Sequence, residues 1–329
     1  MASGYEKIYE YNGINIKYIF KKSDNYVSNN LIIIFSALGP KPVYNYLRTL
    51  EGIDENQLFI LDDIGGRGCY YLEQYDTFYV EKAVIALIND IIVENGIDKR
   101  NVVCGGSSKG GTSALYFALK CGLGHVVIAE PQIKIAKYLI DYSINDVLDY
   151  MTNNNPNDIK AITSINSLLY ELILENNFWP DLIIHAGKET YYFKEHIIDF
   201  LVFLRKENRN YELDLKDYDK HSELIKFYPD LLIDTVLLDL PDNNKKICIK
   251  NIDIIQDWNR FYLHVNGRNF NETAWYVYKD GKKIYTQWYT NNPFFEFTAN
   301  EKGKYTFKAF AQNNMQAKIA RSSSYFEVK

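Results

Sequence analysis

The chain has 329 residues and a net charge of −5, from 37 lysines and arginines against 42 aspartates and glutamates. Hydrophobic residues make up 47% and charged residues 24% of it, proportions that exclude a disordered tail, a collagen-like repeat and a disulfide scaffold. The acidic balance argues against nucleic acid as a partner. The length favours two domains. The cysteines are scattered without metal-site spacing, so we expect reduced thiols and no bound metal.

Neither a membrane span nor a targeting segment is visible. No apolar run reaches the roughly 18 residues that a membrane helix needs. The N-terminus has no basic region followed by a hydrophobic stretch, as a signal peptide would have. We therefore expect a cytoplasmic protein with no membrane span.

The first part of the chain alternates apolar strand patterns with helical patterns. The turn pair Asn12-Gly13 predicts a hairpin. After it, continuous apolar runs predict strands that are covered on both faces, and strands alternating with helices predict a mostly parallel sheet. The predicted strands are 7–11, 14–20, 31–35, 57–61, 102–104 and 125–129, and the helical segments are 42–50, 78–94 and one through 114–119.

The strand signal stops between residues 133 and 177, where apolar residues recur at helical spacing. We interpret this stretch as a helical cap, at about residues 131–180. The alternation then resumes with a strand at 182–185, a helix at 191–206, a strand at 211–215 and a helix around 222–237. The predicted fold class is α/β, a mostly parallel sheet flanked by helices with a cap inserted.

The end of the chain changes to short alternating segments, which are typical of antiparallel strands. Asp280-Gly281 between two such segments is the strongest hairpin signal, and Lys302-Gly303 is another turn. With 241–246 as linker, we expect two domains, residues 1–242 and 243–329. The second is predicted to be an antiparallel β-sandwich of immunoglobulin-like size.

The stretch Gly106-Ser107-Ser108-Lys109-Gly110 follows a predicted strand and precedes a predicted helix. It fits the G-x-S-x-G pattern, in which a serine lies on a sharp strand-to-helix turn and small neighbours relieve crowding. Ser108 would be a nucleophile at the carboxyl end of the strand. A phosphate-binding loop does not fit, because Lys109 precedes Gly110 instead of following it. A glycine-rich turn without chemistry is the alternative.

In this architecture an acid and a histidine follow the nucleophile, each in a loop after a strand. Glu189 follows the strand at 182–185 and is the preferred acid, with Glu195 as the other choice. The competing interpretation of Glu189 is a carboxylate that only stabilises the helix after it. His221 follows the strand at 211–215 and is the predicted general base, and His196 is a weaker second choice.

Other residues are candidates for binding roles. The backbone amide of Lys109 is a predicted oxyanion donor, and the amide of Ala37 or Leu38, after the strand at 31–35, is the second. Arg67 lies in a glycine loop and could contact an anionic substrate group. His185 ends a predicted buried strand, so it is either a core residue or lines a pocket.

These motifs resemble the α/β-hydrolase superfamily over roughly residues 5–240. The GGSSKGGTSAL segment, the absence of HGGG, the post-strand glutamate and the late KHSEL histidine resemble a bacterial group within it. That group comprises capsular polysaccharide biosynthesis proteins and accessory Sec system carbohydrate acetyltransferases. The resemblance implies a triad of Ser108, Glu189 and His221 that acts on O-acyl groups of surface glycans or glycoproteins.

Two functions from different classes therefore stay open. The first is acyl transfer through an acyl-Ser108 intermediate, by an O-acetyltransferase with acetyl-CoA as donor and a glycan as acceptor, or by an O-acetyl esterase with water as acceptor. No bound cofactor is expected. The second is a non-catalytic scaffold protein of polysaccharide or adhesin export, whose β-domain contacts a protein partner.

Overall fold

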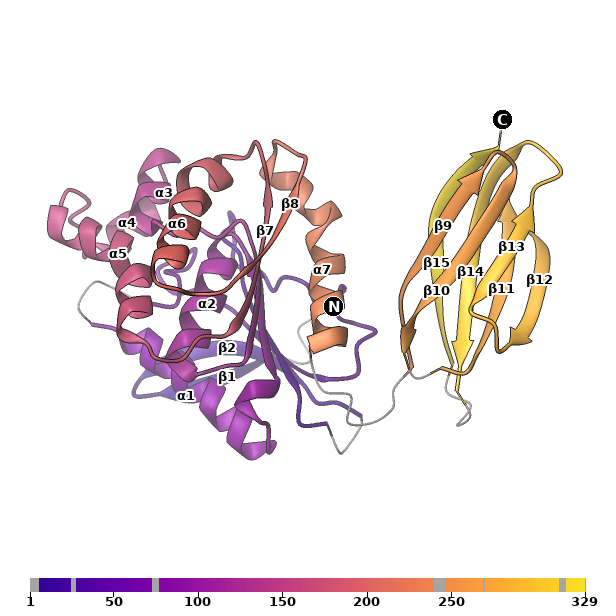
Figure 1. The fold of residues 1–329 in the computed structure, drawn as a ribbon. Helices are drawn as coiled ribbons and strands as arrows, with labels where there is room; N and C mark the ends of the chain where they lie inside the picture. The colour runs from indigo at the N-terminus through magenta and orange to yellow at the C-terminus, as the bar shows by residue number, and fades with distance from the viewer. Residues whose placement is uncertain are drawn as a thin grey trace. The chain divides into compact units, whose positions relative to one another are not determined.

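The computed structural model describes residues 6–24, 28–72, 77–239, 247–268, 270–313 and 318–328. The chain divides into two compact units, Met1–Pro241 and Asp242–Lys329, and each is described by itself (Figure 1). The sequence predicts the division directly after Asp242. The expected linker, residues 241–246, lies outside the described residues.

The first unit is built on one sheet, whose order within the described part of the chain is β1-β2-β4-β3-β5-β6-β7-β8. β3 to β8 pair in parallel, while β1 and β2 form an antiparallel hairpin and β2 joins β4 antiparallel. The predicted α/β fold class is confirmed. The strands are β1 Glu6–Tyr11, β2 Ile14–Lys21, β3 Leu31–Phe35, β4 Asn56–Ile60, β5 Val102–Ser107, β6 His125–Ala129, β7 Asp181–Gly187 and β8 Glu212–Lys216.

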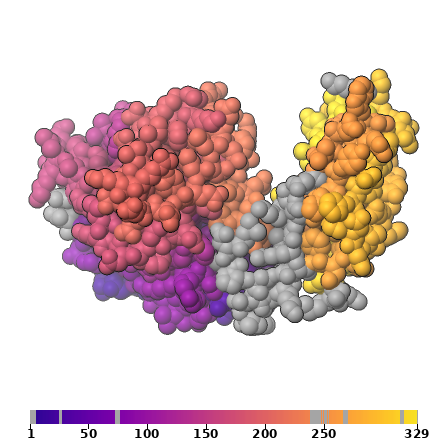
Figure 2. All heavy atoms as spheres, in the orientation of Figure 1, coloured from indigo at the N-terminus to yellow at the C-terminus, as the bar shows by residue number. Residues whose placement is uncertain are grey.

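Helices cover both faces of this sheet, which explains why its inner strands are apolar throughout. One face packs against α1, α2, α6 and the cap helices, and the other against α7 and the segment 44–53 (Figure 1). In the space-filling view the cap segment, coloured magenta to pink, projects from the edge of the unit (Figure 2). The helices are α1 Tyr79–Glu94, α2 Lys109–Cys121, α3 Ile135–Asp141, α4 Asn145–Met151, α5 Ile159–Glu175, α6 Ile198–Lys206 and α7 Tyr228–Asp239.

Residues 42–50 form turns instead of the predicted helix. Two side chains of this segment bond outside it: Asn45 Oδ1 accepts from the Ala37 amide at 2.8 Å, and the Tyr46 hydroxyl donates to Ser107 Oγ at 2.8 Å. Tyr46 also has a positive φ of 60°, which a helix does not allow. The prediction was wrong because these contacts outside the segment determine its backbone.

Two predicted helices are interrupted. The helix expected at 191–206 begins with a wide turn, η2 at Phe193–Ile197, before α6. The helix expected around 222–237 is split into the tight turn η3, His221–Lys226, and α7. A further short turn, η1, spans Lys99–Asn101 before β5.

The second unit contains two antiparallel sheets within the described residues, ordered β13-β10-β9 and β12-β11-β14-β15. Trp275, Phe261 and Phe307 are buried between them. Asp280 and Gly281 have φ values of 48° and 80°, so the predicted tight hairpin turn joins β11 to β12. The strands are β9 Cys248–Asp257, β10 Arg260–Arg268, β11 Glu272–Lys279, β12 Lys282–Thr290, β13 Phe294–Thr298, β14 Gly303–Gln312 and β15 Lys318–Val328.

Candidate active site

Ser108 lies on a strained turn between β5 and α2, with φ 55° and ψ −124°. Two glycines make this turn possible. A Cβ on Gly106 would lie 2.5 Å from the Gly110 backbone, and one on Gly110 would lie 2.4 Å from the Phe35 carbonyl oxygen. The Ser108 amide donates to the Ala129 carbonyl at 2.8 Å, which ties the turn to the end of β6. Backbone strain at such a residue is a feature of functional sites.

The Ser108 hydroxyl accepts a hydrogen bond from Gln132 Nε2 at 2.6 Å. Gln132 is fully buried, and its Oε1 accepts from the Tyr70 hydroxyl at 2.5 Å. Since Tyr70 holds the oxygen, the amide nitrogen is fixed toward Ser108. A side-chain amide nitrogen only donates, so the proton of Ser108 remains available to another acceptor.

A histidine and a carboxylate pair close to this turn. His221 Nδ1, at the start of η3, forms a short hydrogen bond with Glu130 Oε2. Glu130 directly follows β6 with φ 44°, and its side chain is fully buried. Because Nδ1 faces Glu130, Nε2 is the nitrogen that can accept a proton.

Several donors hold Glu130 in its charged form. Burial raises the pKa of Glu130, while the hydrogen bonds from His221, the Gly187 amide and Thr190 lower it, and the net pKa lies below its ordinary value. The carboxylate is therefore ionised at neutral pH and can stabilise a positive charge on His221.

Tyr192, just before η2, contacts both halves of this arrangement. Its ring stacks on the His221 imidazole, with ring centroids 4.1 Å apart. Burial raises the pKa of the Tyr192 hydroxyl, and its hydrogen bonds with Ser108 and Gln132 act in the opposite direction. Ser108 and His221 thus share Tyr192 as a neighbour.

Neither predicted acid contacts His221. The Glu189 side chain is 62% exposed and pairs with Lys194 at 2.8 Å, and this partner lowers the pKa of Glu189. Glu195 pairs with Lys137 at 3.2 Å. The structure places Glu130 where Glu189 was expected. A signal for it was present in the sequence, because Glu130 is the charged residue that ends the apolar run HVVIA.

The oxyanion candidates lie at the ends of β3 and β5. The Lys109 amide is the first of α2, directly after Ser108. The Ala37 amide donates to Asn45 Oδ1, so it is already used. Leu38 therefore fits the second donor better than Ala37.

Two predicted binding residues have protein partners instead. Arg67 forms a two-point ion pair with Asp146 of α4, which joins its glycine loop to the cap. His185 is fully buried, with Nδ1 2.7 Å from Asp214 Oδ2 and Nε2 2.9 Å from the Tyr218 hydroxyl. With both nitrogens occupied, His185 supports the sheet and offers nothing to a substrate.

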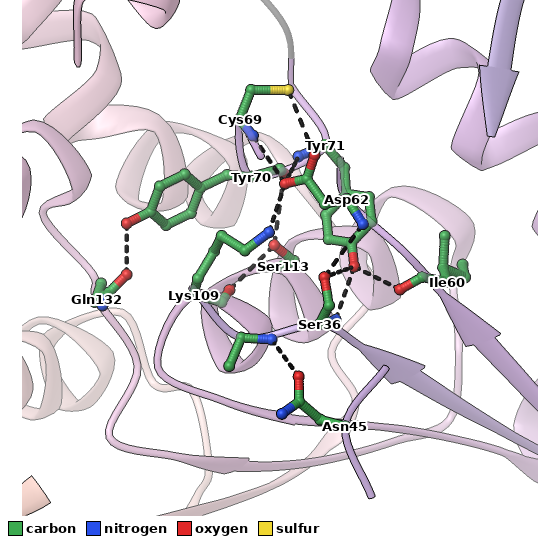
Figure 3. Close-up of polar contacts among 11 residues, drawn as sticks. Ser36, Asn45, Ile60, Asp62, Cys69, Tyr70, Tyr71, Lys109, Ser113 and Gln132 are labelled. Atoms are coloured by element: carbon green, nitrogen blue, oxygen red, sulfur yellow. Dashed lines mark hydrogen bonds and ion pairs between the residues drawn. The ribbon is translucent and has the colours of Figure 1, made fainter. Parts of the chain in front are cut away.

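Lys109, the residue that follows the nucleophile, forms a buried ion pair with Asp62 (Figure 3). Lys109 Nζ contacts Asp62 Oδ2 at 2.6 Å, and both side chains are fully inaccessible to solvent. Asp62 also accepts from the amides of Cys69 and Tyr71, and Lys109 Nζ lies 5.0 Å from the centre of the Tyr71 ring. The Lys109 side chain therefore anchors the residue after Ser108 to the core.

Replacing Lys109 by methionine is expected to destabilise the first unit by about 3–5 kcal/mol, because Asp62 would remain buried without its counter-charge. Urea unfolding measures the loss. The control is Lys194→Met, which breaks an exposed pair and is expected to cost less than about 1 kcal/mol. Equal losses in the two variants would contradict this prediction.

His196 makes the stability of the first unit depend on pH. It is fully buried, and within the part of the chain described here its Nε2 has no hydrogen-bond partner. Burial, with the nearby charges of Lys134 and Lys137, lowers the pKa of His196 to about 4. An unfolded histidine titrates near pH 6.5. The stability from neutral His196 is therefore complete above pH 6.5 and is lost as the pH falls toward 4.

Between pH 7 and pH 4, His196 is expected to account for a loss of up to about 3 kcal/mol in the free energy of unfolding. His196→Phe should lose less stability than the unchanged chain over this interval in urea titrations. The unchanged chain, titrated in parallel, gives the reference slope. A His196→Phe chain with that same slope would exclude this role.

Two features are absent from the described residues. No group of three or more histidines, cysteines, aspartates or glutamates there is arranged to hold a metal ion. No helix there has the length and apolar character to cross a membrane.

Comparisons of the sequence with protein-family models and with curated proteins find no match. Solved structures do match the fold. The capsule O-acetyltransferase of Neisseria meningitidis serogroup A, in complex with CoA, is 24% identical with a TM-score of 0.59, over 72% of this chain and 100% of that chain. FphF, a fluorophosphonate-binding serine hydrolase of Staphylococcus aureus, is 18% identical with a TM-score of 0.55, over 70% of this chain and 97% of that one.

A third match is a chain of the Glycosylation Associate Protein (Gap123) complex from Streptococcus agalactiae. It is 13% identical with a TM-score of 0.59, over 72% of this chain and 47% of that chain. At these identities the likeness concerns the fold. The predicted resemblance is confirmed at that level: the chain has an α/β-hydrolase fold like that of a capsule O-acetyltransferase, a Gap123 component and serine hydrolases.

Proposed function

We propose that the chain transfers acyl groups through Ser108, with His221 as general base and Glu130 as the acid that orients it. The carrying observation is the hydrogen bond between His221 and the buried Glu130 at the end of β6, beside the strained serine turn at the end of β5. A nucleophile, a histidine and a carboxylate that follow strands of one parallel sheet are the parts of a serine triad.

The contacts support a sequence of proton transfers. Glu130 holds His221 Nδ1–H, so Nε2 takes the Ser108 proton while Oγ attacks an acyl carbonyl. Gln132 donates to Oγ and stabilises the charge that develops on it. The Lys109 and Leu38 amides receive the carbonyl oxyanion. His221 then protonates the leaving group, and an acyl-Ser108 ester remains.

His221 next removes a proton from the acceptor, which attacks the acyl-Ser108 ester. We propose a glycan hydroxyl as acceptor and acetyl-CoA as donor, which makes the chain an O-acetyltransferase of surface polysaccharide or glycoprotein biosynthesis. The motif resemblance and the fold shared with a capsule O-acetyltransferase support this choice. With water as acceptor, the same triad acts as an O-acetyl esterase.

One observation favours the alternative, a non-catalytic scaffold of polysaccharide or adhesin export. Ser108 is 5% exposed, and its hydroxyl is already bonded to Gln132. A partner protein would then bind the second unit. The match to a Gap123 complex component is compatible with a protein partner.

Mass spectrometry after separate incubation with a fluorophosphonate probe and with acetyl-CoA distinguishes these functions. A probe adduct on Ser108 is expected, because His221 and Glu130 activate its hydroxyl. An acetyl adduct from acetyl-CoA supports the transferase. A chain whose Ser108 reacts with neither reagent is the scaffold.

A further inference from the structure

We propose that a cavity between β2, the segment 44–51 and η3 binds the phosphorylated end of the coenzyme A thioester. This assignment rests on the acyl-transfer function proposed above and gives its donor a place. The cavity has a volume of about 700 Å³, within the range of small-molecule sites. Its walls include Lys21, Tyr46, Arg48 and Leu224.

Two wall residues of the cavity form hydrogen bonds to the catalytic turn and to the segment after β3. The Tyr46 hydroxyl donates to Ser107 Oγ, one residue before the nucleophile. Asn45 Oδ1 accepts from the Ala37 amide, beside the oxyanion candidate Leu38. On the opposite wall, Leu224 lies in the turn that begins with His221. A ligand in this cavity is therefore next to the elements that position the triad.

Lys21, one of the two cations of the wall, lies away from Ser108. In the sheet, Lys21 of β2 lies opposite Gln57 of β4, and Gln57 lies beside Ile32 of β3. Ile32 in turn lies beside Val103 of β5, so Lys21 and Val103 are at the same level of the sheet. Ser107 lies further along β5, about 13 Å beyond this level at the usual rise of a strand. The site thus suits an elongated ligand with its reactive group at one end and its charges at the other.

The charges of the wall fit phosphate. Lys21 and Arg48 line the cavity, and no carboxylate partner of either is found among the residues that the structure describes. Glu51 is the one acidic side chain in the lining, so the balance is positive. Coenzyme A carries phosphates at one end and the thioester at the other, which matches this polarity.

A second cavity, of about 760 Å³, does not suit a donor. It is lined by His125, Asp181 and Tyr211, which lie at the amino ends of β6, β7 and β8. Ser108 and Glu130 follow the carboxyl ends of β5 and β6, where ligands of open α/β sheets bind. Of these two cavities, the one beside Tyr46 lies next to the elements that position the triad.

The acetyl transfer that this site serves conserves atoms, charge and electrons. Ser108 Oγ forms an ester bond with the acetyl carbon while the thioester C–S bond breaks. The serine proton passes through His221 to the departing thiolate, so free CoA thiol leaves. The acceptor hydroxyl then replaces Ser108 at the acetyl carbon and returns a proton to it by the same route. No oxidant or reductant is consumed.

Calorimetric titration of the full Ser108→Ala chain tests the site without requiring turnover. CoA is expected to bind more tightly than pantetheine, which has the same arm but no phosphate. Lys21→Ala and Arg48→Ala, each added to Ser108→Ala, should weaken CoA binding about ten-fold and leave pantetheine binding nearly unchanged. The matched controls are Lys22→Ala and Arg100→Ala, whose side chains are outside the cavity lining.

The possible results distinguish a failure of the proposed binding site from a failure of the proposed acyl-transfer function. Equal affinity for CoA and pantetheine, CoA affinity unaffected by both cavity variants, or no CoA binding would each overturn the site. Failure of the fluorophosphonate probe to label Ser108 would overturn the acyl-transfer function whatever CoA does. In active chains, the cavity variants should raise the KM for acetyl-CoA about ten-fold more than that for p-nitrophenyl acetate.

Discussion

Ser108→Ala is expected to lower the hydrolysis of p-nitrophenyl acetate by at least about a thousand-fold, because the variant lacks the hydroxyl that forms the acyl ester. Fluorophosphonate labelling should disappear with it. This small ester requires neither donor site nor glycan acceptor, so its hydrolysis reports on the triad alone. Release of p-nitrophenol, followed by absorbance, is the measurement.

The matched control for this result is Ser113→Ala. Ser113 is another buried serine of α2, whose hydroxyl donates to the Lys109 carbonyl. Its loss removes hydrogen bonds to two backbone carbonyls, those of Lys109 and Tyr70, and no reacting atom, so most of the activity should remain. If Ser108→Ala hydrolysed the ester as fast as Ser113→Ala, the acyl-enzyme mechanism would be wrong.

Glu130→Gln is expected to reduce kcat for the same ester about a thousand- to ten-thousand-fold, while Glu189→Gln stays within about two-fold. An amide in place of the Glu130 carboxylate cannot stabilise the imidazolium and favours the wrong tautomer of His221. Glu189 instead pairs with Lys194 at the surface, so its replacement should have little effect on His221. Steady-state kinetics of the two variants, measured side by side, decide which glutamate is the acid.

Circular dichroism spectra accompany these kinetics, because Glu130 is buried and its replacement could disturb folding. Gln keeps the size of Glu and can still accept from the Gly187 amide, which bonds Oε1 at 3.2 Å. A folded Glu130→Gln chain with unchanged kcat would exclude Glu130 as the acid. A large loss in Glu189→Gln alone would restore the acid that the resemblance implies.

The sheet and the serine turn could be predicted from sequence because local patterns determine them. Apolar runs such as 31–35 form strands that are buried on both faces. Gly106 is required by the Gly110 backbone four residues further on, while Gly110 is required by the Phe35 carbonyl of the neighbouring strand β3. The hairpin signal Asp280-Gly281 likewise depends on two residues alone.

The acid could not be assigned in the same way. Which carboxylate contacts His221 depends on how the ends of β6 and β7 and the turn η3 come together in space. The order of residues in the sequence does not give the distances between them. The usual order of triad residues pointed to Glu189, whereas the structure brings Glu130 to the imidazole across the sheet. The failed helix at 42–50 has a similar cause, since Asn45 and Tyr46 bond to residues of other elements.

The position of Glu130 has a consequence for how chains with this arrangement diverge. In the proposed triad the acid acts on the imidazole, so any strand end that reaches His221 can supply the carboxylate. With Glu130 supplying it after β6, the Gly187 amide and Thr190 after β7 serve as donors to Glu130, while Glu189 only pairs with Lys194. Homologues should therefore vary at Glu189 while keeping an acidic residue at the end of β6, and alignments made by triad order alone would misread them.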